Sequence, residues 1–155
     1  MQNSISPEIL PAKPGDVDEL TILALDSKAF WGYSEAFIQS CKAALTITDE
    51  MIERLHSGTI REGNAFVGFY FLSEEEGYAE LQLLYISPLA MGKGFGRALF
   101  KSAMKKAILL GFNTMRIEAD PNAADFYKRM GAKQIGWCRS EVEETRELPL
   151  FMKTF

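Results

Sequence analysis

The chain has 155 residues, of which 47% are hydrophobic and 25% are charged, and its formal net charge is −4. These values are typical of a single soluble globular domain over residues 1–155, and the acidic balance argues against nucleic-acid binding. No stretch approaches the roughly 18 uninterrupted apolar residues that a membrane span needs, and the N-terminus lacks the basic and apolar regions of a signal peptide, so we expect a cytoplasmic protein with no membrane partner.

The cysteine and histidine content limits the possible chemistry. Cys41 and Cys138 are far apart in sequence and outside any Cys-x-x-Cys pair, and His56 is the only histidine. This set disfavours a zinc ribbon, a dithiol redox motif and a histidine metal cluster. A Ser-His-Asp or Cys-His arrangement would have to use His56. We therefore expect two buried free thiols and no bound metal.

The first third of the chain is predicted to be mostly helical. Prolines bracket residues 8–16, which suits a short edge strand because proline cannot donate to a central ladder. Each of the helices expected next begins at a capping residue and keeps apolar spacings of three and four. They run from Asp16 to about Lys28, from Ser34 to about Leu45 and from Thr48 to Leu55, and His56-Ser57-Gly58 is expected to end the last one.

The rest of the chain is predicted to be a meander followed by alternating strands and helices. The expected elements are strands at 59–62, 65–72 and 78–87, a helix at about 94–110, a strand at 114–119, a helix at 121–130 and a final hairpin of 133–140 and 146–153 around the acidic Glu141-Val142-Glu143-Glu144. A strand, crossover helix and strand of this length predict two parallel neighbouring strands with a right-handed connection.

A glycine-rich turn precedes the long helix. Gly92, Gly94 and Gly96 lie where several backbone N–H groups have no intrahelical partner and the helix dipole adds positive charge. Glycines allow a phosphate to approach the backbone, and Lys93 and Arg97 add side-chain charge. An anion-binding turn is therefore predicted, and a plain strand-to-helix turn without a ligand is the alternative.

Two other phosphate motifs fit this turn less well. The Walker pattern fails because Lys93 is followed by glycine and no glycine lies five residues before Gly92. In the dinucleotide-binding pattern G-x-G-x-x-G, Arg97 occupies the position of the third glycine. Glu118 would have to be the acidic residue that binds the ribose hydroxyl. A dinucleotide-binding enzyme therefore stays open as an alternative.

Two segments carry a resemblance to a known family. Tyr85-Ile86-Ser87-Pro88, followed by Met91-Gly92-Lys93-Gly94-Phe95-Gly96-Arg97, resembles the central motif of the GNAT superfamily of acetyl-CoA-dependent N-acetyltransferases. That motif reads Gln/Arg-x-x-Gly-x-Gly/Ala, so Met91 departs from it. Residues 117–132 resemble the strand, Asn-Ala-x-x-Phe-Tyr helix and Gly-Ala ending of many bacterial members. Together the two segments cover about a third of the chain in the family's order.

The resemblance implies a fold and a reaction. The expected fold is α/β, of the GNAT acyl-CoA N-acyltransferase type, with a mixed six- or seven-stranded sheet splayed between two central parallel strands and flanked by helices. The expected reaction moves acetyl from acetyl-CoA to a primary amine of a small molecule or peptide, by direct attack in a ternary complex without a metal. The protein is expected to be a monomer or homodimer. A non-catalytic acyl-CoA-binding module is the rival interpretation.

The resemblance also implies site residues. The residues expected to bind coenzyme A are Leu84, Tyr85, Ile86, Met91, Gly92, Lys93, Gly94, Phe95, Gly96, Arg97, Asn122 and Tyr127. In the family the tyrosine at the position of Tyr127 lies near the sulfur of coenzyme A. A phenol with a pKa of about 10 can give a proton to a thiolate whose thiol pKa is about 8.5. The alternative for Tyr127 is a half-buried packing residue with its hydroxyl in water.

Glu80 is the candidate base. Strand alternation predicts Glu80 and Gln82 on one face, opposite Leu81 and Leu83, so that the carboxylate can face a cleft. The segment resembles Phe-Ala-Glu-Ile in the histone-modifying branch of the family, where the glutamate deprotonates the amine through water. Burial would raise the pKa of Glu80 toward the working pH. A solvated strand glutamate, with a water chain as the base, is the alternative.

The binding site of the acceptor amine is expected between the first helices and the last hairpin, as the resemblance to the family implies. The residues expected there are Trp31, Tyr33 and Arg146, with Phe30 and Glu35 nearby. Aromatic rings with neighbouring acids suit a cationic amine through cation–π contact. The same aromatics also suit an ordinary hydrophobic core.

Overall fold

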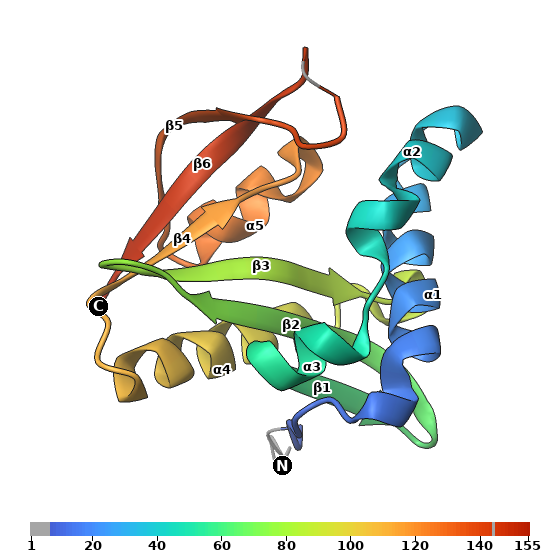
Figure 1. Ribbon diagram of the computed structural model, residues 1–155, viewed down its shortest axis with the longest axis horizontal. Helices are drawn as coiled ribbons and strands as arrows, with labels where there is room; N and C mark the ends of the chain where they lie inside the picture. Colours follow the sequence, from blue (N-terminus) through green and yellow to red (C-terminus); the bar gives the residue numbers. More distant parts are fainter. Residues whose placement is uncertain (1–6, 144) are drawn as a thin grey trace.

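A mixed β-sheet forms the centre of the molecule (Figure 1). In the computed structural model, which describes residues 7–143 and 145–155, it has six strands in the order β1-β2-β3-β4-β6-β5. The strands are β1 (His56–Glu62), β2 (Ala65–Glu74), β3 (Ala79–Ile86), β4 (Thr114–Glu118), β5 (Lys133–Arg139) and β6 (Glu147–Thr154). Residues 1–6 and Glu144 lie outside the described residues. Residues 1–6 belong to the N-terminal segment that was predicted to lack a targeting signal, and Glu144 belongs to the predicted acidic loop.

Helices cover both faces of the sheet (Figure 1). They are α1 (Val17–Ala29), α2 (Glu35–Leu45), α3 (Asp49–Arg54), α4 (Phe95–Leu109) and α5 (Ala124–Arg129). One core lies beneath α4 and α5 and includes the fully buried Leu81, Phe100 and Phe151. The other lies beneath α1 and α2 and includes Phe69 and Phe71. Within the described residues, no helix is both long and apolar enough to cross a membrane.

Local capping confirms two of the predicted helix caps and corrects a third. The Ser34 hydroxyl accepts from the Phe37 N–H at 3.1 Å, and the Thr48 hydroxyl accepts from the Met51 N–H at 3.2 Å. Asp16 occupies the predicted N-cap position of α1, but its side chain makes no capping hydrogen bond to that helix. Its carboxylate instead accepts from the Lys13 N–H at 2.9 Å and closes a 3-10 turn, Pro14–Asp16, that leads into α1.

Two predicted boundaries near the N-terminal half also differ. The expected edge strand at 8–16 is reduced to one isolated bridge between Leu10 and Thr59, because prolines on either side leave few N–H donors for a ladder. His56-Ser57-Gly58, expected only to end a helix, begins β1. A Cβ at Gly58 would lie 2.4 Å from the Tyr70 ring, so glycine here allows the neighbouring strand's tyrosine to pack against the backbone.

A β-bulge in β3 overturns the predicted side-chain alternation. Phe71 pairs with Leu83 whereas Leu72 pairs with Leu81, so Gln82 is an extra residue in β3. Leu81 consequently packs in the core beneath α4, and Leu83 packs against the core beneath α1. The prediction that both leucines share one face was therefore wrong, because strict alternation assumes an uninterrupted ladder.

The sheet is splayed between β3 and β4, as predicted. The parallel ladder contains only two pairs, Ala79 with Met115 and Glu80 with Arg116. Beyond them β3 stays paired with β2 as far as Ile86, and β4 stays paired with β6 as far as Glu118. The two halves of the sheet therefore separate, and among the described residues no strand pairs with the β4-facing edge of β3 from Leu81 onward.

Candidate functional site

The splay opens into a large cleft with a volume of about 720 Å³. Its walls come from β3, the glycine turn, the end of β4, and α5. Among the residues expected to bind coenzyme A, all but Lys93 line it: Leu84, Tyr85, Ile86, Met91, Gly92, Gly94, Phe95, Gly96, Arg97, Asn122 and Tyr127. The tertiary structure thus brings the two sequence motifs together in one cleft.

The glycine turn at the mouth of this cleft presents free backbone donors. Gly92 and Gly94 have φ angles of 81° and 86°, in the left-handed region that favours glycine. In the described part of the chain, the N–H groups of residues 92–97 find no hydrogen-bond acceptor. A Cβ at Gly96 would lie 3.1 Å from the Phe126 ring, which holds the helix start against α5. The turn therefore fits an anionic group such as a diphosphate.

Lys93 lies outside the cleft. Its ammonium is 3.6 Å from the Glu62 carboxylate, and both side chains are about half exposed. The charge that faces the cleft from this turn therefore comes from Arg97 and from the backbone N–H groups.

Tyr127 projects into the same cleft from a buried position. It is only 5% exposed and packs against the rings of Phe100, Phe126 and Phe151. Burial raises the pKa of the Tyr127 phenol well above its ordinary value, and the negative charge of Asp120 raises it further. The phenol therefore stays protonated at neutral pH and can act as a proton donor.

A smaller cavity of about 290 Å³ adjoins the cleft. Its charged lining includes Glu80, Glu118, Glu141 and Arg146. Lys28, Glu118 and Asp120 line both cavities, as does β3 from Leu81 to Leu83, so the two cavities meet at the splay. Within the described residues, the three glutamates of the smaller cavity form no ion pair.

Glu80 lines only the smaller cavity. Burial raises the pKa of its carboxyl above the ordinary value, and the nearby charges of Glu118 and Glu75 add to the rise. The Arg116 guanidinium opposes this effect from the neighbouring strand, where it also lies 4.7 Å from the centre of the Tyr78 ring. Glu80 can therefore accept a proton nearer neutral pH than an exposed glutamate would.

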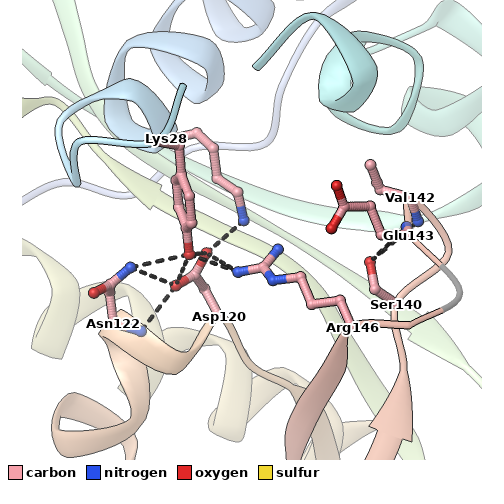
Figure 2. A network of polar contacts seen from close by, with 8 residues as sticks. Lys28, Asp120, Asn122, Ser140, Val142, Glu143 and Arg146 are labelled. Atoms are coloured by element: carbon pink, nitrogen blue, oxygen red, sulfur yellow. Dashed lines mark hydrogen bonds and ion pairs between the residues drawn. The ribbon is translucent and has the colours of Figure 1, made fainter. Parts of the chain in front are cut away.

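Asp120 is the centre of a polar network at the junction of the two cavities (Figure 2). Its carboxylate accepts from the Lys28 ammonium at 2.5 Å and from the Tyr33 hydroxyl at 2.9 Å. The Asn122 N–H donates to it at 2.8 Å, and Arg146 Nη2 lies 3.5 Å away. Burial alone would raise the pKa of Asp120, but the hydrogen bond and charge of Lys28 outweigh burial and lower it. The carboxylate is therefore ionised at neutral pH.

The Asp120 carboxylate caps the 3-10 turn Pro121–Ala123 by accepting from the Asn122 N–H, but the sequence analysis gave Asp120 no part in the site. Sequence reasoning missed the network because Lys28 and Tyr33 are 92 and 87 residues away in sequence. No local pattern marks a contact of that kind.

The expected acceptor residues occupy different positions. Trp31, which is 44% exposed, lines the larger cleft, whereas Phe30 lies outside both cavities. The Tyr33 hydroxyl accepts from Arg146 Nη2 at 2.5 Å, and Lys28 and Arg146 lie 5.4 Å and 5.0 Å from the centre of the Tyr33 ring. Burial, and then Asp120, raise the pKa of Tyr33 to about 12. The Tyr33 ring and hydroxyl thus already hold the protein's own cations.

Both cysteines are free, as predicted. Cys41 is buried, but Cys138 is only half-buried. Among residues 7–143 and 145–155, no three His, Cys, Asp or Glu side chains are grouped as metal ligands.

Comparison with known proteins gives a family and a set of similar structures. Residues 19–145 match the family model described as the acetyltransferase (GNAT) domain. A search of curated protein sequences found no match. A GCN5-related N-acetyltransferase from Rhodopseudomonas palustris is 21% identical, with a TM-score of 0.80, over 100% of this chain and 99% of that chain.

Several of the similar structures contain coenzyme A, and two are described here. The PaiA N-acetyltransferase from Thermoplasma acidophilum, in complex with coenzyme A, is 20% identical with a TM-score of 0.77, over 97% of this chain and 100% of that chain. An aminoglycoside 6′-N-acetyltransferase complexed with coenzyme A is 16% identical with a TM-score of 0.72, over 95% of this chain and 96% of that chain. At these identities the similarity establishes the fold.

Proposed function

Because the chain belongs to the GNAT family of acetyltransferases, we propose that it transfers an acetyl group from acetyl-CoA to a primary amine of a small molecule or peptide. The observation that carries this proposal is the single cleft that joins the open glycine turn, the free edge of β3 and Tyr127. The glycine turn would bind the diphosphate of acetyl-CoA, the free edge of β3 would bind its extended thioester arm, and Tyr127 would lie beside the reacting thioester.

The chain's own groups would hold acetyl-CoA as follows. The N–H groups of residues 92–97 bind the diphosphate, and Arg97 adds positive charge. Within residues 7–143 and 145–155, the main chain of Leu84, Tyr85 and Ile86 has no strand paired with it on the β4 side, and it bonds the extended arm as a neighbouring strand would. One of these N–H groups also stabilises the oxyanion that develops on the acetyl carbonyl.

Glu80 and Tyr127 would handle the two protons of the reaction. The acceptor ammonium first loses a proton to Glu80, directly or through water. The neutral nitrogen forms a bond to the acetyl carbon while the carbon–sulfur bond breaks. Tyr127 gives its proton to the departing thiolate, and the proton that the attacking nitrogen loses as the amide forms passes through water to the Tyr127 phenolate. Glu80 then releases its proton to solvent, and free coenzyme A and the acetylated amine leave. All atoms and charges are accounted for without a metal or a covalent enzyme intermediate.

We propose an acceptor that carries more than one positive charge. Glu80, Glu118 and Glu141 line the smaller cavity and have no ion-pair partner in the part of the chain that the structure describes, whereas its Lys28 and Arg146 are held by Asp120 and Tyr33. A second ammonium group on the acceptor would be attracted to these carboxylates. One similar structure is named as an aminoglycoside acetyltransferase, which is in keeping with a cationic acceptor.

The decisive experiment is an acetyl-transfer screen. Release of free thiol from acetyl-CoA is measured with n-butylamine, 1,4-diaminobutane, spermidine, kanamycin and an alanine-initiated peptide. We expect turnover, with the multiply charged amines preferred over n-butylamine. Turnover with n-butylamine alone would contradict the choice of acceptor and leave acetyl transfer in place.

Binding separates the rival functions. Acetyl-CoA at one hundred times its Kd should stabilise the protein by about 2.7 kcal/mol, and NAD should have no effect. Stabilisation by acetyl-CoA without turnover on any amine would favour a non-catalytic acyl-CoA-binding module. Stabilisation by NAD alone would favour a dinucleotide-binding enzyme and overturn the proposal.

A further inference from the structure

One carboxylate at the junction of the two cavities holds two cationic side chains. Asp120 contacts the Lys28 ammonium at 2.5 Å and Arg146 Nη2 at 3.5 Å. The three side chains are only 15%, 10% and 17% exposed, respectively. Water therefore screens these charges far less than it screens ion pairs at the surface.

The three charged groups come from separate parts of the fold (Figure 2). Lys28 lies near the end of α1, Asp120 follows β4, and Arg146 directly precedes β6. Tyr33, from the segment between α1 and α2, connects them, because its hydroxyl donates to Asp120 and accepts from Arg146. Asp120 thus ties the helical wall of the site to the last hairpin.

The location of this network connects it to the reaction. Lys28 and Asp120 line both cavities, and Arg146 lines the smaller one. An acceptor amine bound in the smaller cavity would reach a thioester in the larger cleft through this junction. The carboxylate is also the only negative charge in contact with the two cations among the described residues.

We infer that Asp120 is a positioning residue for acyl transfer: its charge holds Lys28 and Arg146 beside the junction and so keeps the passage from the smaller cavity to the thioester open. This inference rests on the proposed acetyltransferase function. Without the Asp120 charge, the two cations repel each other and the Tyr33 hydroxyl loses its strongest acceptor. The side chains then reorient at the junction and raise the barrier to a cationic acceptor.

A charge-neutral, nearly isosteric substitution tests the inference. Asp120→Asn should lower kcat/KM for 1,4-diaminobutane by about tenfold or more. The Kd of acetyl-CoA, measured by calorimetry, should stay within about twofold, because the substituted amide keeps an oxygen that can accept from the Asn122 N–H and the glycine turn is unchanged. Asp26→Asn is the matched control, since Asp26 is exposed on α1 and lines neither cavity.

A second variant separates positioning by charge from a simple loss of packing. Lys28→Met combined with Asp120→Asn removes one of the two repelling cations, and it should regain about threefold or more of the lost kcat/KM. A double variant that is no better than the single one, or an acetyl-CoA affinity that falls as much as turnover, would assign Asp120 a purely structural role and overturn the inference. So would an Asp120→Asn variant with parental kinetics.

Hydrogen exchange distinguishes failure of this inference from failure of the proposed function. In Asp120→Asn without any ligand, peptides that contain Lys28 and Arg146 should exchange faster, while β1 and β2 keep their protection. If the parent protein neither binds acetyl-CoA nor acetylates 1,4-diaminobutane, the proposed function is wrong, and so is the inferred effect of Asp120 on acyl transfer. Unchanged exchange in the variant would refute the holding role itself.

Discussion

Tyr127 combines burial with a position in the cleft, which is what a proton donor to a thiolate requires. Its phenol lies among Phe100, Phe126 and Phe151 in the core beneath α5. Tyr127→Phe removes only the hydroxyl, so the ring packing is kept. We expect kcat to fall by roughly 10²-fold or more while the Kd of acetyl-CoA is unchanged, as rapid-mixing kinetics and calorimetry would show. Parental kcat in this variant would exclude Tyr127 as the donor.

The pKa of Glu80 predicts the pH dependence of the reaction. Burial and the neighbouring Glu118 raise this pKa, so the carboxylate becomes protonated as the pH falls through a value above the ordinary glutamate pKa of about 4.3. Since the base must be ionised, kcat/KM should rise with pH through that value. Glu80→Gln should lose this acidic limb, whereas Glu147→Gln, on the exposed start of β6, should keep it. A limb that persists in Glu80→Gln would indicate a different base.

The lowered pKa of Asp120 predicts how the free energy of unfolding changes at acidic pH. Its folded-state pKa is lowered below the unfolded value of about 3.9, so the unfolded chain binds the proton more tightly. The stabilisation is therefore fully present above the unfolded pKa and is lost as the pH falls through the folded pKa. Urea unfolding of the parent between pH 6 and pH 3, at about unit steps, should show this loss, and Asp120→Asn should show a shallower dependence on pH. Parallel curves for the two proteins would contradict the shifted pKa.

At the scale of elements, the glycine turn depends on backbone conformation. Gly94 has a φ of 86°, so Gly94→Ala strains the start of α4 by about 1–2 kcal/mol and displaces the N–H groups that face the cleft. Thermal unfolding should show the lost stability, and calorimetry should show at least a comparable loss of acetyl-CoA binding free energy. Gly15→Ala is the matched control, since Gly15 has no left-handed φ and a Cβ there would contact nothing within 4 Å.

Most elements follow from short-range sequence signals. The caps at Ser34 and Thr48, the crossover from β3 to β4 through α4, and the final hairpin all match the predictions. The errors came where a neighbouring strand or turn intervened. The bulge at Gln82 depends on pairing with β2, and the 3-10 turn at Asp16 competes with capping of α1. The periodicity of a single segment does not predict either effect, because each depends on contacts with another segment or turn.

At the scale of the whole molecule, a continuous core compensates for the interrupted sheet. The two halves of the sheet share only two ladder pairs, but β3, β4, β6 and α4 all contribute to the core beneath α4. Phe151 of β6 is fully buried there, 5.9 Å from the Tyr127 ring between centroids. The core therefore holds the cleft walls at their separation.

This arrangement predicts the cost of a cavity in the shared core. Phe151→Ala should reduce the free energy of unfolding by about 3–5 kcal/mol, as measured by urea denaturation. Phe155→Ala, at a position 38% exposed near the C-terminal end of the sheet, is the control and should have an effect of less than about 1 kcal/mol. Similar losses in both variants would show that the two halves of the sheet do not depend on this core.

The residues alone determined the order of elements, the glycine turn and the family, because each depends on neighbours within a short stretch of chain. Tertiary structure decided where β3 and β4 separate, that two cavities meet there, and that Tyr33 binds protein cations. It also placed Asp120 against Lys28 and Arg146, which are 92 and 26 residues away. Contacts of that kind form only when separate elements pack, and the free energy that selects them is a property of the whole core.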